Sequence, residues 1–239
     1  MGINNSTAPS AGPSDNSPVS QSILTILKNA KTSAYKPNQQ ETANILPLKN
    51  QPPLVSNNKP EILYIGADYC PYCAAERWVL VTALSKFGTF SKLNYMTSST
   101  SDVDPGTNTF TFYNSVYTSK YISFVGVETS TNISNGSGGY TPLQSITTAQ
   151  QALFQKFDYP PTVPSQAQGA IPFIDLGNRA IISGAQYLPS DLSNKNWSQI
   201  AKDVKNGTSP DGMDILSSAN AVISQICSLT QNQPISVCG

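Results

Sequence analysis

The sequence predicts an α/β fold, and two stretches carry that prediction. Residues 61–66 form an apolar, strand-like run that leads through a short turn into helically spaced apolar residues beginning near Cys70. Further along, residues 173–183 have the pattern of two short strands joined by a tight turn. Additional helices to cover a sheet are expected at residues 145–157, 197–207 and 215–226.

The amino-terminal segment, residues 1–19, is rich in Ser, Pro, Asn and Gly and has almost nothing apolar to bury. We therefore expect a disordered linker or stalk there. Residues 20–239 then form a single domain, which begins with a short helix at residues 21–30. Prolines interrupt residues 43–55, which predicts an edge strand or an extended arm.

After the first long helix, the middle of the chain alternates apolar stretches with polar ones. Strands are expected at residues 92–96, 110–113 and 121–128, where aromatic and β-branched residues dominate. Loops are expected at residues 98–107 and 129–141, and the second of these is rich in Ser, Asn and Gly.

The carboxyl-terminal third contains the predicted hairpin and two helices. Pro172 stands at the entry to the first strand of the hairpin, where proline is tolerated. The first of the two helices is expected to end at Gly207. We expect the last helix to be entered through Asp211 or Asp214, since a short carboxylate caps a helix amino terminus well.

Composition excludes some classes of partner. Only 12% of the 239 residues are charged, and 14 basic residues balance 14 acidic ones. Because such a chain has no strong field of one sign, we expect it to bind neither nucleic acid nor an anionic membrane surface.

The same composition is typical of an exported protein. Ser, Thr, Asn and Gln carry most of the polar surface, and several Asn-x-Ser/Thr sequons are present. The sequons begin at Asn4, Asn5, Asn132, Asn135, Asn196 and Asn206. We expect an extracellular or cell-surface location, with a leader or membrane anchor lying outside the present chain.

Cys70, Pro71, Tyr72 and Cys73 form the most informative motif of the chain. Pro71 suits the first position of a helix, which places Cys70 at the helix amino terminus. Unpaired N–H groups and the helix dipole favour a thiolate there, and two cysteines at this spacing can close a disulfide. A redox-active dithiol is the interpretation that we favour. Half of a zinc site and an inert structural disulfide are the alternatives, although the chain has no histidine and no second C-x-x-C.

Cys227 and Cys238 flank a carboxyl-terminal tail, residues 227–238. We favour a structural disulfide between them over two free thiols, and in the chain-entropy model it contributes roughly 3 kcal/mol. Such a bridge indicates an oxidising compartment, or the cytoplasm of a thermophile as the alternative.

A C-x-x-C at a strand-to-helix turn, followed by a proline before a two-stranded hairpin, resembles the thioredoxin superfamily. Cys70-Pro-Tyr-Cys73 is similar to the motif of many glutaredoxins, Ile171-Pro172 matches the cis-proline position, and Gly184 matches a glycine after the last strand. The resemblance implies a three-layer fold, a central mixed sheet flanked by helices, with an insertion around residues 98–164. The chain also resembles an uncharacterised archaeal family of unknown function with a thioredoxin-like core.

The resemblance further implies a thiol–disulfide oxidoreductase that acts on protein thiols or disulfides and needs no cofactor or metal. Cys70 would attack and Cys73 would resolve the mixed disulfide. The other implied residues shape the site or bind substrate; they are Pro71, Tyr72, Tyr69, Asp68, Ile171 and Pro172. Tyr64 stands where thioredoxin has a buried acid, and Tyr69 where it has a tryptophan. The alternatives are a redox-inert binding or surface module and, less favoured, a metal carrier using the same cysteines.

Overall fold

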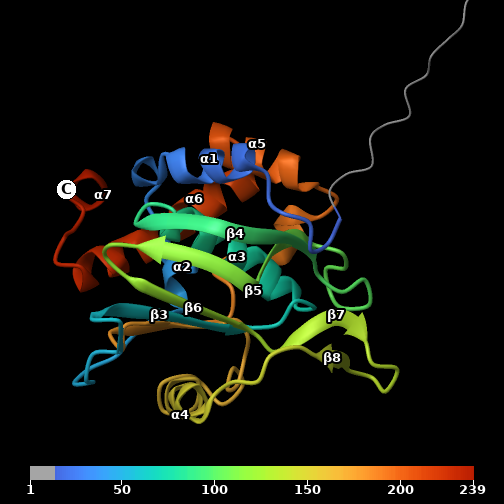
Figure 1. Ribbon diagram of the computed structural model, residues 1–239, viewed down its shortest axis with the longest axis horizontal. Coiled ribbons are helices and arrows are strands. Elements are labelled where there is room, and N and C mark those ends of the chain that lie inside the picture. Colours follow the sequence, from blue (N-terminus) through green and yellow to red (C-terminus); the bar gives the residue numbers. More distant parts are fainter. Residues whose placement is uncertain (1–13) are drawn as a thin grey trace, which may run out of the picture.

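A computed structural model describes residues 14–239 of the chain (Figure 1). The strands are β1 (Ile45–Pro47), β2 (Val55–Ser56), β3 (Lys59–Gly66), β4 (Gly88–Thr97), β5 (Asn108–Ser119), β6 (Ser123–Glu128), β7 (Ser130–Ser134), β8 (Tyr140–Pro142), β9 (Phe173–Leu176) and β10 (Ala180–Ser183). The helices are α1 (Gln21–Asn29), α2 (Gln39–Ala43), α3 (Pro71–Leu84), α4 (Thr148–Phe157), α5 (Trp197–Asn206), α6 (Pro210–Leu229) and α7 (Ile235–Cys238), with short 3-10 turns η1 (Thr32–Ala34) and η2 (Pro189–Leu192).

Strand β3 is the centre of a mixed sheet. It pairs antiparallel with β9 on one side and parallel with β6 on the other. The β9–β10 hairpin continues the sheet, and β1 closes that edge by pairing with β10. The expected α/β class with a mixed sheet and helical layers is confirmed, as is the edge position of a strand within residues 43–55.

Helices cover both faces of this sheet, and the alternation of β3 side chains shows why. Ile62 and Tyr64 pack in one core cluster with α3 and α6, whereas Leu63 and Ile65 pack in a second cluster with Phe157 of α4. Figure 1 shows α4 on one side of β3 and β6, and α3 and α6 on the other. A strand that is buried on both faces has a continuous run of apolar residues, and the sequence of β3 contains such a run.

The predicted linker extends less far than expected. The backbone N–H of Asn16 donates to the Tyr95 carbonyl at 2.8 Å, and the N–H of Tyr95 donates to the Ser17 carbonyl at 2.9 Å. The N–H of Val19 likewise donates to the Leu93 carbonyl at 2.9 Å. Residues 16–19 therefore lie along β4 and belong to the fold, while the rest of the predicted linker, up to residue 13, lies outside the described residues.

The region expected to be an insertion, residues 98–164, contributes to the central sheet through β6. The hairpin β4–β5 precedes β6, and a second hairpin, β7–β8, follows it. The prediction of a loop at residues 129–141 is wrong there, because β7 and β8 are short, polar strands that lack an apolar alternation. The glycines at the hairpin turn, Gly136 and Gly138, adopt positive φ angles of 75° and 83°.

Helix α6 begins before both of the expected entry residues. Its N-cap is Ser209, whose hydroxyl oxygen accepts a hydrogen bond from the N–H of Gly212 at 3.3 Å. Asp211 instead lies in the first turn and pairs with Lys195 at 2.7 Å, so the expected entry through Asp211 or Asp214 is wrong. The preceding helix does end as predicted, with Gly207 in the left-handed conformation.

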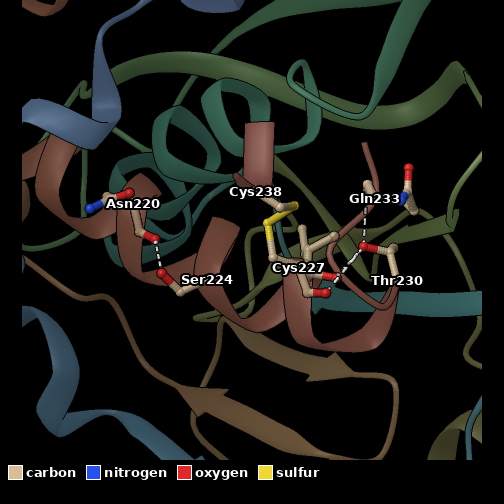
Figure 2. The surroundings of a disulfide bond; sticks show 7 residues. Asn220, Ser224, Cys227, Thr230, Gln233 and Cys238 are labelled. Atoms are coloured by element: carbon tan, nitrogen blue, oxygen red, sulfur yellow. Dashed lines mark hydrogen bonds between the residues drawn. A yellow bond between two sulfur atoms is a disulfide. The ribbon is translucent and has the colours of Figure 1, made fainter. Parts of the chain in front are cut away.

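The carboxyl-terminal tail is joined to α6 by the expected Cys227–Cys238 disulfide (Figure 2). Beside it, the Thr230 hydroxyl lies 2.6 Å from the Gln233 carbonyl, which helps the chain to turn back toward the helix. None of the helices formed by residues 14–239 combines the length and the apolar character that crossing a bilayer requires.

Candidate functional site

Cys70 is the N-cap of α3, at the end of the turn that leaves β3. Its backbone is extended, and its sulfur accepts a hydrogen bond from the N–H of Cys73 at 3.2 Å. Both cysteines are free thiols; Cys70 is 5% exposed and Cys73 is fully buried. The expected placement of the pair on the first turn of a helix is therefore what the structure shows.

The surroundings of the two thiols shift their pKa values in opposite directions. The pKa of Cys70 is lowered, first by a hydrogen bond with the Cys73 side chain, and further by backbone N–H groups and the positive charge of Arg77. Burial raises the pKa of Cys73 well above its ordinary value. Cys70 is therefore the more acidic thiol of the pair, and the one more readily converted to a thiolate.

The segment before β9 lies against Cys70. The Cys70 sulfur lies 3.8 Å from the carbonyl oxygen of Ile171, although 101 residues separate the two in the chain. The peptide bond between Ile171 and Pro172 is cis, and the Pro172 carbonyl accepts a hydrogen bond from Gly184 at 2.9 Å. The fold thus brings the C-x-x-C together with the second motif singled out in the sequence.

Tyr69 and Tyr72 lie on either side of the motif in different surroundings. The Tyr69 ring stacks on Tyr140 of β8, with ring centroids 4.0 Å apart, and the Tyr69 carbonyl accepts a hydrogen bond from Ser99 at 2.9 Å. Tyr72 is 39% exposed. The loop between β4 and β5 and the β7–β8 hairpin therefore both contact the turn that carries the cysteines, and Tyr72 is the exposed aromatic side chain of the motif.

Sequence reasoning missed a buried ion pair close behind the cysteines. Arg77 of α3 donates to Glu128 of β6 through Nε at 2.9 Å and through Nη2 at 2.8 Å, and both side chains are fully buried. The sequence holds two signals of this pair. Arg77 lies one helical turn after Cys73 in a mostly apolar helix, and Glu128 ends the predicted strand at residues 121–128.

Asp68 is the third member of this buried group. Its carboxylate lies 3.7 Å from Arg77 Nη2, which is an ion-pair distance and too long for a hydrogen bond. Burial raises its pKa to about 7, and repulsion from Glu128 adds to the effect. The Asp68 side chain is 2% exposed, so it lies behind the cysteines and does not face solvent.

Tyr64, at the position of the acid expected from the resemblance, is part of the core. It packs edge-on against Phe112 with ring centroids 4.9 Å apart, and the Arg77 guanidinium lies 5.9 Å from its ring centroid. Burial raises its pKa well above the ordinary value, so its hydroxyl stays protonated. The buried acids near the cysteines are instead Asp68 and Glu128.

The side chains around the pair do not form a ready metal site. Within the described part of the chain, no group of three or more His, Cys, Asp or Glu side chains is arranged to hold a metal ion. The cationic neighbour of the two cysteines, Arg77, is also unfavourable for a second positive charge.

Comparison with known proteins places the chain in a family. Searches of the curated proteins and of the solved structures found no match. A family model described as "Domain of unknown function (DUF929)" matches residues 44–228, which is more than half of the 239 residues and includes Cys70, Cys73 and Pro172. The chain therefore belongs to the DUF929 family of domains of unknown function.

Proposed function

We propose that this protein is a thiol–disulfide oxidoreductase that acts on protein disulfides through Cys70 and Cys73. One observation carries the proposal. The sulfur of Cys70 caps α3, accepts the N–H of Cys73 at 3.2 Å, and lies 3.8 Å from the Ile171 carbonyl. A thiol held at a helix amino terminus, beside a second thiol and the cis Ile171–Pro172 segment, has the parts that disulfide exchange requires.

The topology supports a thioredoxin-like core, which we propose as the finer description of the fold. The helix that carries the cysteines follows β3, a parallel strand (β6) lies on one side of β3, and an antiparallel hairpin (β9–β10) lies on the other. On this description, hairpins β4–β5 and β7–β8 are additions to that core.

The reaction begins at Cys70. Its thiolate attacks one sulfur of a substrate disulfide, so that a Cys70–substrate disulfide forms and one substrate sulfur leaves as a thiolate that takes up a proton. Cys73 then loses its proton and attacks the Cys70 sulfur, which releases the second substrate thiol. The substrate gains two electrons, and the protein is left with a Cys70–Cys73 disulfide; an external thiol reverses this change.

An exported location is part of the proposal. The Cys227–Cys238 disulfide supports an oxidising compartment, since structural disulfides persist there. A thermophile cytoplasm is the alternative setting in which such a bridge is stable.

A second candidate is a redox-inert binding module that retains the fold. The observation that favours it is burial, because Cys70 is 5% exposed and Cys73 is fully buried. In that case the Cys70–Cys73 bond, once formed, would be structural and hard to reduce.

The reduction potential of the Cys70–Cys73 pair separates the two candidates. We expect the pair to equilibrate with a glutathione buffer at a potential between about −120 and −270 mV, the range of known oxidoreductases. The fraction of free thiol is measured by alkylation and mass spectrometry, with the Cys227→Ser/Cys238→Ser variant used to remove the second disulfide. A potential below about −300 mV would mark a structural bridge and favour the inert module.

A further inference from the structure

We propose that the buried Arg77–Glu128 ion pair sets the reactivity of Cys70, with Arg77 acting as a positioning residue whose charge stabilises the thiolate and Glu128 limiting that effect. The inference rests on the proposed function and goes beyond it, because it assigns the control of the site to two residues outside the C-x-x-C motif.

Arg77 is held rigidly between three elements. Its Nε and Nη2 atoms donate to Glu128, and Nη2 also donates to the Ala67 carbonyl at 2.7 Å. Ala67 begins the turn that carries Cys70, so the guanidinium links that turn, the end of β6 and its own helix. An arginine fork fixed by a bidentate carboxylate has little freedom to move when the thiol changes its charge.

The remaining donor group of Arg77 is free. Its Nη1 atom is buried and has no hydrogen-bond partner among the described residues. Arg77 follows Cys73 by four positions in α3, so the two side chains lie on the same face of the helix, one above the other. In an interior that screens charge poorly, a guanidinium at this position stabilises an anion on the neighbouring sulfurs.

Glu128 opposes this effect and is fixed just as firmly. Its Oε1 atom accepts a second hydrogen bond, from the N–H of Phe112 in β5 at 3.2 Å. The pKa of Cys73 is raised by the Glu128 charge and lowered by that of Arg77, although burial has the larger effect. The Arg77 charge also lowers the pKa of Cys70, whose sulfur accepts the N–H of Cys73. Removing the Arg77 charge should therefore raise the pKa of Cys70, and removing the opposite charge of Glu128 should lower it.

The test measures the pKa of Cys70 directly, from the pH dependence of its alkylation by iodoacetamide, with the modified residue identified by mass spectrometry. Glu128→Gln is expected to lower this pKa and Arg77→Met to raise it, so that the alkylation rate of the Arg77→Met protein at pH 7 falls about tenfold, one pKa unit. A merely structural role would not give shifts of opposite sign.

The double variant Arg77→Met/Glu128→Gln is the decisive arm, because each single variant leaves a buried charge unpaired and loses stability. It keeps an acceptor for Phe112 and is expected to show a raised Cys70 pKa, because the Arg77 charge acts on Cys70 more strongly than the Glu128 charge does. Arg179→Met, which removes the exposed arginine of the β9–β10 turn, is the matched control and should leave the pKa unchanged. An unchanged Cys70 pKa in the double variant, or shifts of the same sign in the two single variants, would overturn the inference.

Alkylation requires no catalytic turnover, so the inference and the proposed function fail separately. Opposite shifts in a protein without turnover would contradict the proposed function alone. Catalytic turnover by a protein whose Cys70 pKa does not change when Arg77 is replaced would contradict the inference alone.

Discussion

The Cys73→Ser protein is expected to accumulate a covalent mixed disulfide with its substrate, whereas Cys70→Ser is expected to reduce substrate reaction to the uncatalysed background. The reason is the asymmetry of the pair. Cys70 is the thiol with the lowered pKa and the more exposed of the two, so we expect it to attack first. Cys73 is fully buried behind it, and without its sulfur the first intermediate cannot be resolved.

Intact-protein mass spectrometry after incubation with a disulfide substrate measures both effects. The adduct mass should appear in the Cys73→Ser protein and disappear on treatment with a reductant. The Cys227→Ser/Cys238→Ser variant is the control, since it also replaces cysteines with serines but leaves Cys70 and Cys73 in place and should keep turnover. An adduct on Cys70→Ser as abundant as on Cys73→Ser would contradict the assigned order of attack.

Glu76→Gln is expected to remove a large pH dependence of stability. Glu76 lies on α3, is fully buried, and accepts the N–H of Gln186 at 3.1 Å. Burial raises its pKa to about 8, against 4.5 for an ordinary glutamate. The unfolded chain therefore releases this proton near pH 4.5, while the folded protein holds it to about pH 8.

The sign of the effect follows from this difference. Between those two pH values the folded state binds the extra proton, so the free energy of unfolding falls as the pH rises, at about 1.4 kcal/mol for each pKa unit. Over the whole interval the loss amounts to several kcal/mol. Glutamine keeps the acceptor for Gln186 and does not ionise, so the variant should gain stability over the wild type as the pH rises from 5 to 9.

Urea unfolding at pH 5, 7 and 9 checks this expectation. Glu61→Gln is the matched control, because Glu61 is a half-buried glutamate of β3 whose pKa is also raised by burial, and its substitution should change the pH dependence less. Parallel stability curves for the wild type and Glu76→Gln across the three pH values would show that Glu76 does not hold its proton as described.

The parts of the fold that could be predicted from the sequence are those in which local chemistry and packing agree. The β3–α3 unit combines an apolar run, a proline at the first helical position and a C-x-x-C, and each feature favours the same structure. The β9–β10 hairpin has a Gly-Asn turn in which Gly177 and Asn178 both adopt positive φ, at 64° and 57°. The two cysteines could therefore be predicted from the residues, whereas the place of Ile171-Pro172 beside them was implied by the resemblance to the thioredoxin superfamily.

The remaining features depend on contacts between distant residues. Strands β7 and β8 are polar, and their pairing brings Tyr140 onto Tyr69, a contact between segments about seventy residues apart. Residues 16–19 form backbone hydrogen bonds to β4. Backbone pairing does not depend on side-chain type, so the composition of this segment, rich in Ser, Pro and Asn, does not indicate it.

The ion pair behind the cysteines was missed for a related reason. Arg77 and Glu128 are 51 residues apart, and each looks like an ordinary surface charge when considered alone. Their burial becomes evident only when β6 is placed beside β3, because that pairing brings the end of β6 to the level of the turn before α3. An arginine one helical turn after a C-x-x-C is the feature of the sequence that indicates a charge close to the cysteines.

The most direct test of the central claim is steady-state turnover of a protein disulfide by the wild-type protein. Reduction of insulin disulfides, with dithiothreitol as the external thiol, should proceed faster than the uncatalysed reaction and in proportion to the protein concentration. The same protein alkylated at Cys70 should give only the background rate. Equal rates with and without the wild-type protein, under conditions in which Cys70 and Cys73 are shown to be reduced, would contradict the proposal that this pair is a catalytic dithiol.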